Sequence, residues 1–522
     1  MALIKTSAQS NKTGVETPSA SYLSLKPLWK KARAILQGEA HAKAHDEYIS
    51  HTGENLLIPF SPTMSQNQYD FYKSESELPG LTAQYSKVLI GALLRKDSQL
   101  TLPDEFGEDA YNWLTKDFTL DGQSLFNFLD AAIWEELQTS RAWVYVDRPS
   151  VSDADYDMMT PEERMSINPY PVVIQAENVI NVQIGAHPKT RGKTLLRWIT
   201  RYVAESYTEE NPWHPTYVDT VADHYLDKEG KLVIDYYEKK AGAATVEALN
   251  GEIRQDYNDS VDGGFKKVNS SMPMKFGERL DFIPAWPLNG QLEPIEPVLM
   301  PLIDREVALY NKMSRRNHLL YGAATYTPVV QSDMTDEEFE EIVSAGLGTW
   351  LRVRAGETIT VLETPTAALS DMDRAIESTI GEMAKMGIRM LSPEQAASGV
   401  ALEIRNASQT AQLGTLNTKI SGTMQEVISF MINWKYNTEL SGNDIEFKLS
   451  ADFSPMVGGE GAMRLVSDWY QSGVISRNTF ISIAKYNDFL PANYDDEEAI
   501  QQIQQDPLVN TVPDSQIELE EE

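Results

Sequence analysis

The chain has 522 residues, a net charge of −32 and no cysteine. This charge excludes a protein that coats nucleic acid through a basic surface, and the lack of thiols excludes disulfides, cysteine-ligated metals and thiol catalysis. The length predicts three or four domains, at ~150 residues each. No apolar run reaches the ~18 residues that a membrane helix needs, so we expect no membrane contact.

The N-terminal part begins with a polar segment that is followed by helices. Residues 1–21 are rich in Ser, Thr and Asn and are expected to form a flexible arm. Residues 22–37 have the pattern of a short basic amphipathic helix, and the apolar spacing predicts another helical region over 66–96. A third helix is predicted over 121–137, where an Asp-Gly pair provides the start signal.

Short strands are predicted next along the chain. Runs of β-branched and aromatic residues, separated by polar turns, lie at 142–146, 170–174, 179–182, 195–199, 224–226 and 232–237. Residues 240–290 are expected to be rich in loops. Together with the preceding helices, these strands predict an α+β fold.

The second part of the chain begins with a long helix predicted over 297–321. A small module of strands follows, with a helix that Thr335 is expected to cap. Residues 367–390 again have a helical pattern, and small and polar residues interrupt it at 392–399.

The longest periodic segment covers residues 401–440. Its apolar residues are spaced by three and four positions and form the stripe Leu413, Leu416, Ile420, Met424, Val427, Met431 and Trp434. A long helix with one apolar stripe needs a partner surface, which its own chain or a neighbouring chain can supply.

The C-terminal part is predicted to hold one strand, two helices and a tail. The strand lies at 445–449 and the helices at 460–472 and 477–487, with Ser476 as the N-cap of the last. Residues 495–522 contain acidic residues and no basic one, which is typical of a solvated tail.

Motifs that could carry catalysis or bind a cofactor are incomplete. Residues 192–194 (GKT) resemble the end of a phosphate-binding loop. His187 stands at the position where that loop needs its first Gly, so we expect a hairpin turn. Alternating aspartates at 153–157 lack the Gly and Glu of a calcium loop, and predict an acidic surface loop or a weak adventitious cation site. His41 and His45 lack the general base of a zinc protease. We therefore expect no catalytic residue, no metal and no cofactor.

The second half of the helix 297–321 is basic. It carries Lys312, Arg315, Arg316 and His318. Such a face is typically solvated or paired with acidic neighbours, and contact with a polyanion is the alternative.

The order of these pieces resembles the core of tailed-bacteriophage portal proteins, and more specifically the portal family long catalogued as a domain of unknown function. Residues 141–149 (RAWVYVDRP) and 383–391 (MAKMGIRML) are similar to segments of that family. Five further segments match more loosely and in the same order: 121–122, 168–181, 301–314, 408–416 with 452–453, and 473–479. Three positions depart from the pattern, namely Asn168, Val182 and Arg315. The resemblance covers roughly residues 65–490.

The resemblance implies an α+β portal fold with a fixed order of parts. These are a flexible arm (1–21), an α/β wing (22–290), a stem helix (291–321), a small α/β clip (322–366), a second stem helix (367–390), a tunnel loop (391–400), the long helix and return strand of the wing (401–458), a helical crown (459–494) and an acidic tail (495–522).

A portal of this kind implies a homo-oligomeric ring, usually of twelve subunits, at one vertex of the capsid. The ring is the channel for packaging and ejection of double-stranded DNA, without sequence specificity. It docks first the terminase and then the head–tail adaptor, and its other partners are the major capsid protein and the scaffold protein. The expected location is the virion, with assembly in the host cytoplasm, and the expected role is not enzymatic.

Contact residues follow from this assignment as hypotheses. Those expected near DNA are Glu394, Gln395 and Ser398 in the tunnel loop, and Lys312, Arg315 and Arg316 on the stem. Those expected in the docking surface of the clip are Glu337, Glu338, Trp350 and Arg352.

Two other classes of function stay open. One is a different structural virion protein, associated with capsid or scaffold, which would lack a fixed ring stoichiometry. The other is a carboxylate-based hydrolase, which would be a compact monomer or dimer with a deep pocket.

Overall fold

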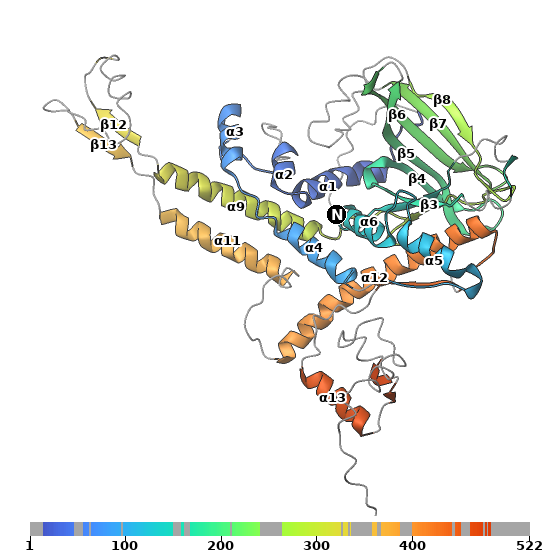
Figure 1. The fold of residues 1–522 in the computed structure, drawn as a ribbon. Helices are drawn as coiled ribbons and strands as arrows, with labels where there is room; N and C mark the ends of the chain where they lie inside the picture. Colours follow the sequence, from blue (N-terminus) through green and yellow to red (C-terminus); the bar gives the residue numbers. More distant parts are fainter. Residues whose placement is uncertain are drawn as a thin grey trace, which may run out of the picture. The chain divides into compact units, whose positions relative to one another are not determined.

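A computed structural model of the chain describes residues 14–45, 56–61, 64–95, 98–149, 158–160, 167–208, 211–240, 264–324, 327–331, 335, 358–362, 367–386, 399–440, 444–449, 460–472, 476–477 and 479–481. The chain forms two compact units, Met1–Ala451 and Asp452–Glu522. The first unit combines helices with antiparallel sheets, which confirms the predicted α+β class (Figure 1).

The N-terminal helices are α1 (Ala20–Leu36), α2 (Glu39–His45), α3 (Gln66–Glu75), α4 (Leu81–Leu93), α5 (Gly107–Lys116) and α6 (Leu125–Thr139). Ser19 caps α1, because its Oγ accepts from the Tyr22 N–H at 3.2 Å. The Ser19 N–H in turn donates to the Ile180 carbonyl at 2.9 Å. The last residues of the predicted arm are therefore fixed by a contact with Ile180, while residues 1–13 lie outside the described ranges.

The start predicted for α6 is wrong by four positions. Ser124 is the N-cap, with its Oγ 3.3 Å from the Asn127 N–H, and the helix begins at Leu125. Asp121 instead accepts from the Gln123 N–H at 3.2 Å within the preceding loop. Because Asp and Ser both favour loops and N-caps, the spacing alone did not distinguish them.

The largest sheet has five antiparallel strands in sequential order: β4 (Val179–Ala186), β5 (Lys193–Thr208), β6 (Asn211–Leu226), β7 (Leu232–Lys240) and β8 (Lys266–Ser271). The strands predicted at 195–199 and 224–226 are parts of β5 and β6, which have 16 residues each. Their extra length was missed because one face alternates charged residues that pair across strands, as Arg201 does with Asp219 at 2.7 Å.

A three-stranded sheet, with the order β11 (Ala285–Pro287), β2 (Trp143–Asp147) and β3 (Tyr170–Ile174), packs on the larger one. The Trp143 and Tyr145 rings lie 5.8 and 5.3 Å from the Trp198 ring of β5. The opposite face of the larger sheet is covered by α1, through a buried cluster that includes Trp29 and Val221. The larger sheet is thus buried on both faces over part of its length.

Shorter elements complete the described strands and turns. The remaining pairs are β1 (Gln99–Thr101) with β14 (Glu446–Lys448), β9 (Met274–Lys275) with β10 (Glu278–Arg279), and β12 (Thr327–Gln331) with β13 (Thr358–Leu362). Two 3-10 turns are η1 (Asp104–Phe106) and η2 (Ala176–Asn178). The region expected to be loop-rich, 240–290, therefore holds four short strands in its described part.

The long helix α12 (Gly399–Tyr436) confirms the predicted periodic segment. From Ile420 onward its stripe is buried, and Trp434 is only 3% exposed. The partner surface comes from its own chain: the Phe430 ring lies 5.5 Å from that of Trp286, and the Trp434 Nε1–H donates to the Met274 carbonyl at 3.0 Å.

The second unit contains α13 (Glu460–Gln471) and the first turn of the helix predicted from 477. Ser476 caps that turn as predicted, accepting from the Thr479 N–H at 3.2 Å. The Tyr470 and Phe480 rings stack at 5.0 Å and connect the two helical pieces. The predicted acidic tail, 495–522, lies outside the described residues.

Candidate functional site: the paired helices α9 and α11

The helix α9 (Met300–Ala324) carries the three stem residues that the sequence singled out. Its 25 residues span about 37 Å at 1.5 Å per residue. One face of the N-terminal half is buried in the first unit, with Ile303, Leu309 and Tyr310 all fully covered. In the C-terminal half, Leu320 and Tyr321 are exposed.

Polar side chains fasten the buried half of α9 to the N-terminal helices. The Glu306 carboxylate accepts from the backbone N–H groups of Leu81 and Thr82, at 3.1 and 2.9 Å. The Asn311 amide accepts from the Ile58 N–H at 2.7 Å and donates to the Leu56 carbonyl at 2.7 Å. Buried polar groups need such partners, so this half of α9 has a fixed position in the unit.

The helix α11 (Ala367–Lys385) runs antiparallel to α9 along a polar seam. The Lys312 Nζ donates to the Thr379 Oγ1 at 2.6 Å, and Arg316 pairs with Asp373. Toward the start of α9, the Arg305 Nη1 lies 3.4 Å from a Glu382 oxygen. Residues with higher numbers on α9 contact residues with lower numbers on α11, so the two helices run in opposite directions (Figure 1).

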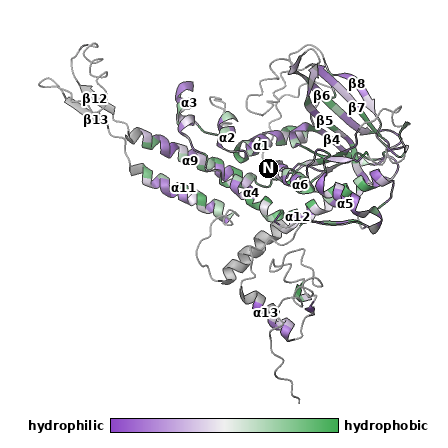
Figure 2. Ribbon diagram, viewed as in Figure 1, coloured by the Kyte–Doolittle hydropathy of each residue, from purple (hydrophilic) through white to green (hydrophobic). Residues whose placement is uncertain are grey.

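Figure 2 shows hydrophilic and hydrophobic residues mixed along both helices of this pair. Under the polar seam, Met383 is fully buried. On the remaining surface of α11, Ile380 and Met386 are 41% and 44% exposed. Within the described ranges, α11 therefore packs on α9 and leaves another of its sides exposed.

The other cations of α9 face the N-terminal helices. Arg315 is exposed and lies beside Tyr72, where burial raises the pKa of the phenol to about 12 and the Arg315 charge opposes that rise. The His318 ring stacks on Phe60 at 4.5 Å, and its Nδ1 lies 3.4 Å from a Glu75 oxygen. Arg316, through Asp373, thus matches the ion-pairing expectation. Lys312 instead donates to a hydroxyl and a backbone carbonyl of α11, and any contact with DNA stays a prediction.

Of the three groups of predicted site residues, the structure describes the stem group. The antiparallel strands β12 and β13 follow α9 and precede α11 along the chain, within the range predicted for the clip. The predicted clip surface (Glu337, Glu338, Trp350 and Arg352) and the predicted tunnel-loop contacts (Glu394, Gln395 and Ser398) lie outside the described residues.

The sequence motifs that resembled catalytic or metal sites take other roles. Residues 187–192 form the turn between β4 and β5, closed by the His187 N–H to the Gly192 carbonyl at 2.8 Å, so the expected hairpin is confirmed. His41 and His45 lie on α2, and the alternating aspartates at 153–157 are outside the described residues. Nowhere in the described ranges do three or more potential ligands converge as a metal site requires.

Membrane insertion receives no support from the described helices. None of them combines the length and the hydropathy needed to cross a bilayer.

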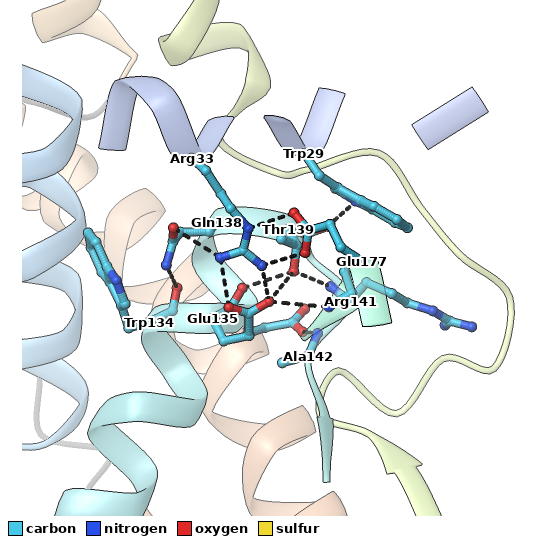
Figure 3. A network of polar contacts seen from close by, with 11 residues as sticks. Trp29, Arg33, Trp134, Glu135, Gln138, Thr139, Arg141, Ala142 and Glu177 are labelled. Atoms are coloured by element: carbon cyan, nitrogen blue, oxygen red, sulfur yellow. Dashed lines mark hydrogen bonds and ion pairs between the residues drawn. The ribbon is translucent and has the colours of Figure 1, made fainter. Parts of the chain in front are cut away.

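A buried ionic network around Arg33 was not predicted from the sequence (Figure 3). On α1, the Arg33 guanidinium donates to both Glu177 oxygens at 2.6 Å and to both Glu135 oxygens at 2.6 and 2.9 Å. Burial opposes the charged form, but the two carboxylates outweigh it and raise the pKa of Arg33. Beside the network, the Trp29 Nε1–H donates to the Thr139 carbonyl at 3.1 Å. The network joins α1, α6 and η2. Arg33, Glu135 and Glu177 are far apart in the sequence, so their spacing does not predict the contact.

Two further buried groups titrate abnormally. Burial raises the pKa of Glu136 to about 8, although the Ala142 N–H donates to its carboxylate at 3.0 Å. Burial lowers the pKa of His224 to about 4. Neither group has a neighbouring nucleophile among its hydrogen-bond partners, and both pack inside the fold rather than at a surface.

Known proteins resemble this chain in one segment of its sequence and, at low similarity, in structure over most of its length. No curated protein matches it. Two of the solved structures that match have a TM-score of 0.36 each. They are "Neck of native GTA particle computed with C12 symmetry", at 11% identity over 86% of this chain and 98% of that one, and "Neck of empty GTA particle computed with C6 symmetry", at 10% identity over 76% and 86%. At this TM-score neither one assigns a fold to the chain. A family model described as "Domain of unknown function (DUF4055)" matches residues 298–435, which contain α9, α11 and nearly all of α12.

Proposed function

We propose that this protein is a portal: a homo-oligomeric ring that connects the head and tail of a phage or phage-like particle and conducts its DNA. The observation that carries the proposal is the arrangement of the segment matched by the family model. The antiparallel helices α9 and α11 flank the strand pair β12–β13 along the chain, and the 38-residue helix α12 follows. This is the order of stem, clip, stem and long helix that the sequence resemblance implies.

The packing of α11 supports a ring. Within its own chain α11 contacts α9 on one side, while Ile380 and Met386 remain exposed on another. In a closed ring each subunit uses one surface to bind the next subunit's complementary surface, so the neighbour's stem would cover such a face. A ring of twelve subunits is the stoichiometry that the resemblance implies.

Charge supports a channel through which DNA slides without being held. The net charge of −32 disfavours tight binding, because affinity for duplex DNA depends on neutralising its phosphates. Lys312 and Arg316 are already engaged with α11, which leaves Arg315 as the exposed cation among the three stem candidates. We propose that a few such cations, together with Glu394, Gln395 and Ser398, face the DNA.

The proposed role is structural rather than catalytic. In this role the clip, with Glu337, Glu338, Trp350 and Arg352, docks the terminase during packaging and the head–tail adaptor afterwards. The major capsid protein and scaffold protein would contact the ring during assembly in the host cytoplasm.

Light scattering of the purified protein, followed by negative-stain imaging, tests the ring. A mass near twelve times the 58.6 kDa of one subunit, with annular particles around a central hole, is the expected result. A folded protein that stays monomeric or dimeric at high concentration, with or without scaffold protein, contradicts the proposal. Elongated or shell-like assemblies without a fixed stoichiometry would favour a different virion protein.

A packaging assay tests the proposed tunnel loop. The double variant Glu394→Lys with Gln395→Lys should impair packaging or ejection and leave the ring mass unchanged. A matched control with the same change in charge, Glu278→Lys with Gln66→Lys, lies outside 298–435 and should package normally. Normal packaging by the Glu394 variant removes the tunnel-loop assignment without affecting the ring.

A further inference from the structure

A cluster of tyrosines surrounds a carboxylate where β2 and β3 pack on the larger sheet. Along β2 alternate residues face the larger sheet, so Trp143, Tyr145 and Asp147 lie on one face. The rings of Trp143 and Tyr145 pack on Trp198, which is 1% exposed. Asp147 is the last residue of β2 and lies two residues after Tyr145, on the same face of the strand. It is only partly buried.

Three further tyrosines come from three different strands. Tyr170 of β3 lies directly opposite Asp147 in the strand register. Tyr202 of β5 and Tyr236 of β7 belong to the face of the larger sheet that carries Trp198, with the small residues Thr220 and Ala222 of β6 paired to them.

The pKa shifts of these tyrosines agree with their placement on faces that meet Asp147. The Asp147 charge adds to burial in raising the pKa of Tyr170, Tyr202 and Tyr236. The exposed Glu238 also raises the pKa of Tyr202. Tyr202 is 37% exposed, so the cluster opens to solvent.

Asp147 has no cation beside it among the described residues. Its carboxylate accepts from the Arg148 N–H at 2.8 Å, and burial raises its pKa. The opposite face of the larger sheet differs, because each buried aspartate there has a basic partner: Asp219 with Arg201, Asp223 with Arg197 and Asp235 with Lys267, all within 3.0 Å. The larger sheet therefore pairs these aspartates with cations, whereas Asp147 of β2 has no such partner among the described residues.

We propose that Asp147, Tyr170, Tyr202 and Tyr236 form a cage that binds an arginine side chain of a basic partner protein. Tyrosine rings attract a cation to their faces, and the attraction is stronger when the cation is partly desolvated. The guanidinium is planar, weakly hydrated and able to stack on a ring while donating to a carboxylate, so arginine fits better than lysine. A separate basic partner is favoured over a second copy, because each copy carries a net charge of −32.

Saturation-transfer NMR on the full-length protein tests the cage. The probes are N-acetyl-arginine methylamide, its lysine counterpart and its neutral citrulline counterpart, which has nearly the shape of arginine. The arginine probe should receive saturation, with binding at least fivefold tighter than that of citrulline and tighter than that of lysine. Equal saturation of arginine and citrulline overturns the cage, and this comparison needs no variant.

Four variants locate the binding. Asp147→Asn keeps the shape and should weaken arginine binding at least fivefold, and Tyr202→Leu should weaken it at least threefold. Tyr202→Phe retains the ring and should bind within twofold of the unmodified protein. Glu229→Gln, at the exposed β6–β7 turn of the same sheet, is the matched control for loss of a carboxylate and should bind normally. Unchanged binding by Asp147→Asn overturns the assignment.

The mass of the Asp147→Asn protein distinguishes the source of the arginine. An assembly of unchanged mass is expected if the arginine comes from a separate partner. A change in assembly mass that accompanies the loss of arginine binding would assign the cage to a neighbouring copy and overturn the separate partner.

Discussion

Glu306 of α9 caps the N-terminus of α4, 224 positions earlier in the chain, by accepting from both the N–H and the Oγ1–H of Thr82 at 2.9 Å. The residue in the N-cap position is Gly80, with φ of +69°, which has no side chain to offer. The carboxylate therefore supplies the missing acceptor and places negative charge at the positive end of the helix dipole. It also joins the segment matched by the family model to the N-terminal helices.

Replacing Glu306 with Gln should destabilise α4 and its contact with α9. The amide keeps one acceptor but loses the charge and one hydrogen bond to the helix end, at a cost of about 1–2 kcal/mol. Hydrogen exchange followed by mass spectrometry should show faster exchange in the first turn of α4. The control is Glu382→Gln, an exposed carboxylate on α11, which should leave α4 unchanged. Unaltered exchange in α4 of the Glu306 variant contradicts the capping role.

Replacing Arg33 with Met should destabilise the first unit more strongly. The change leaves Glu135 and Glu177 buried without their cation, and breaking a buried pair costs about 3–5 kcal/mol. A marked drop in melting temperature is therefore expected. Adding Glu135→Gln and Glu177→Gln to the variant should restore part of the lost melting temperature, because the buried carboxylates are then neutral.

The control for Arg33 is Arg374→Met on α11. Its side chain is 76% exposed and pairs with Asp371 at 3.2 Å, so its loss should change the free energy of unfolding by less than about 0.5 kcal/mol. If the Arg33 and Arg374 variants melt at the same temperature, the network contributes little to stability.

The positions of the main helices could be predicted from the sequence, because local patterns dictate them. The apolar stripe of α12 from Ile420 to Trp434 and the cap at Ser476 depend on residues within a few positions of one another. The α+β class follows from the same local signals. The lengths of β5 and β6 could not be predicted, since charged residues such as Asp219 and Asp223 belong to the strands only because arginines of β5 pair with them across the sheet.

For the polar contacts of the site, the sequence could predict the chemical type of the partner but not the element that supplies it. A basic half of α9 indicated either solvent or acidic partners, and Asp373 on α11 is such a partner for Arg316. Which helix supplies it depends on the tertiary fold. The same holds for the Arg33 network, where the contacts bridge 102 and 144 positions and no spacing rule applies.

Reversing the charges of Arg316 and Asp373 tests the seam between α9 and α11. Arg316→Asp should weaken the pairing of the two helices, because it places like charges in contact, and Asp373→Arg should do the same. The double variant should recover most of the loss. Each exposed pair contributes about 0.2–1 kcal/mol to one chain, but a ring would repeat the effect in every subunit.

Light scattering and melting temperature should be measured on all four proteins of this cycle. Loss of ring mass in each single variant and its recovery in the double variant is the expected result. Effects that add without recovery would show that the two side chains act independently and that the seam does not position the stem.

The pH dependence of stability should carry the signature of His224. Its ring is buried beside Trp198, and its Nδ1 lies 3.2 Å from the Trp198 carbonyl. Because burial lowers the pKa of His224 to about 4, the unfolded chain takes up a proton below pH ~6.5 that the folded chain refuses. The neutral ring thus makes its full contribution to the free energy of unfolding above pH ~6.5. That contribution falls by up to about 3 kcal/mol as the pH drops to 4.

The variant His224→Gln keeps a hydrogen-bond donor for the Trp198 carbonyl and does not titrate in this range. Melting temperatures measured from pH 7.5 to 4.5 should therefore fall less steeply for the variant than for the unmodified protein, with the two curves approaching each other below pH 6.5. The carboxylates titrate in both proteins, so their effect cancels in the difference between the curves. Parallel curves over the whole range would mean that His224 takes up its proton at the same pH in the folded and the unfolded chain, which contradicts a pKa lowered by burial.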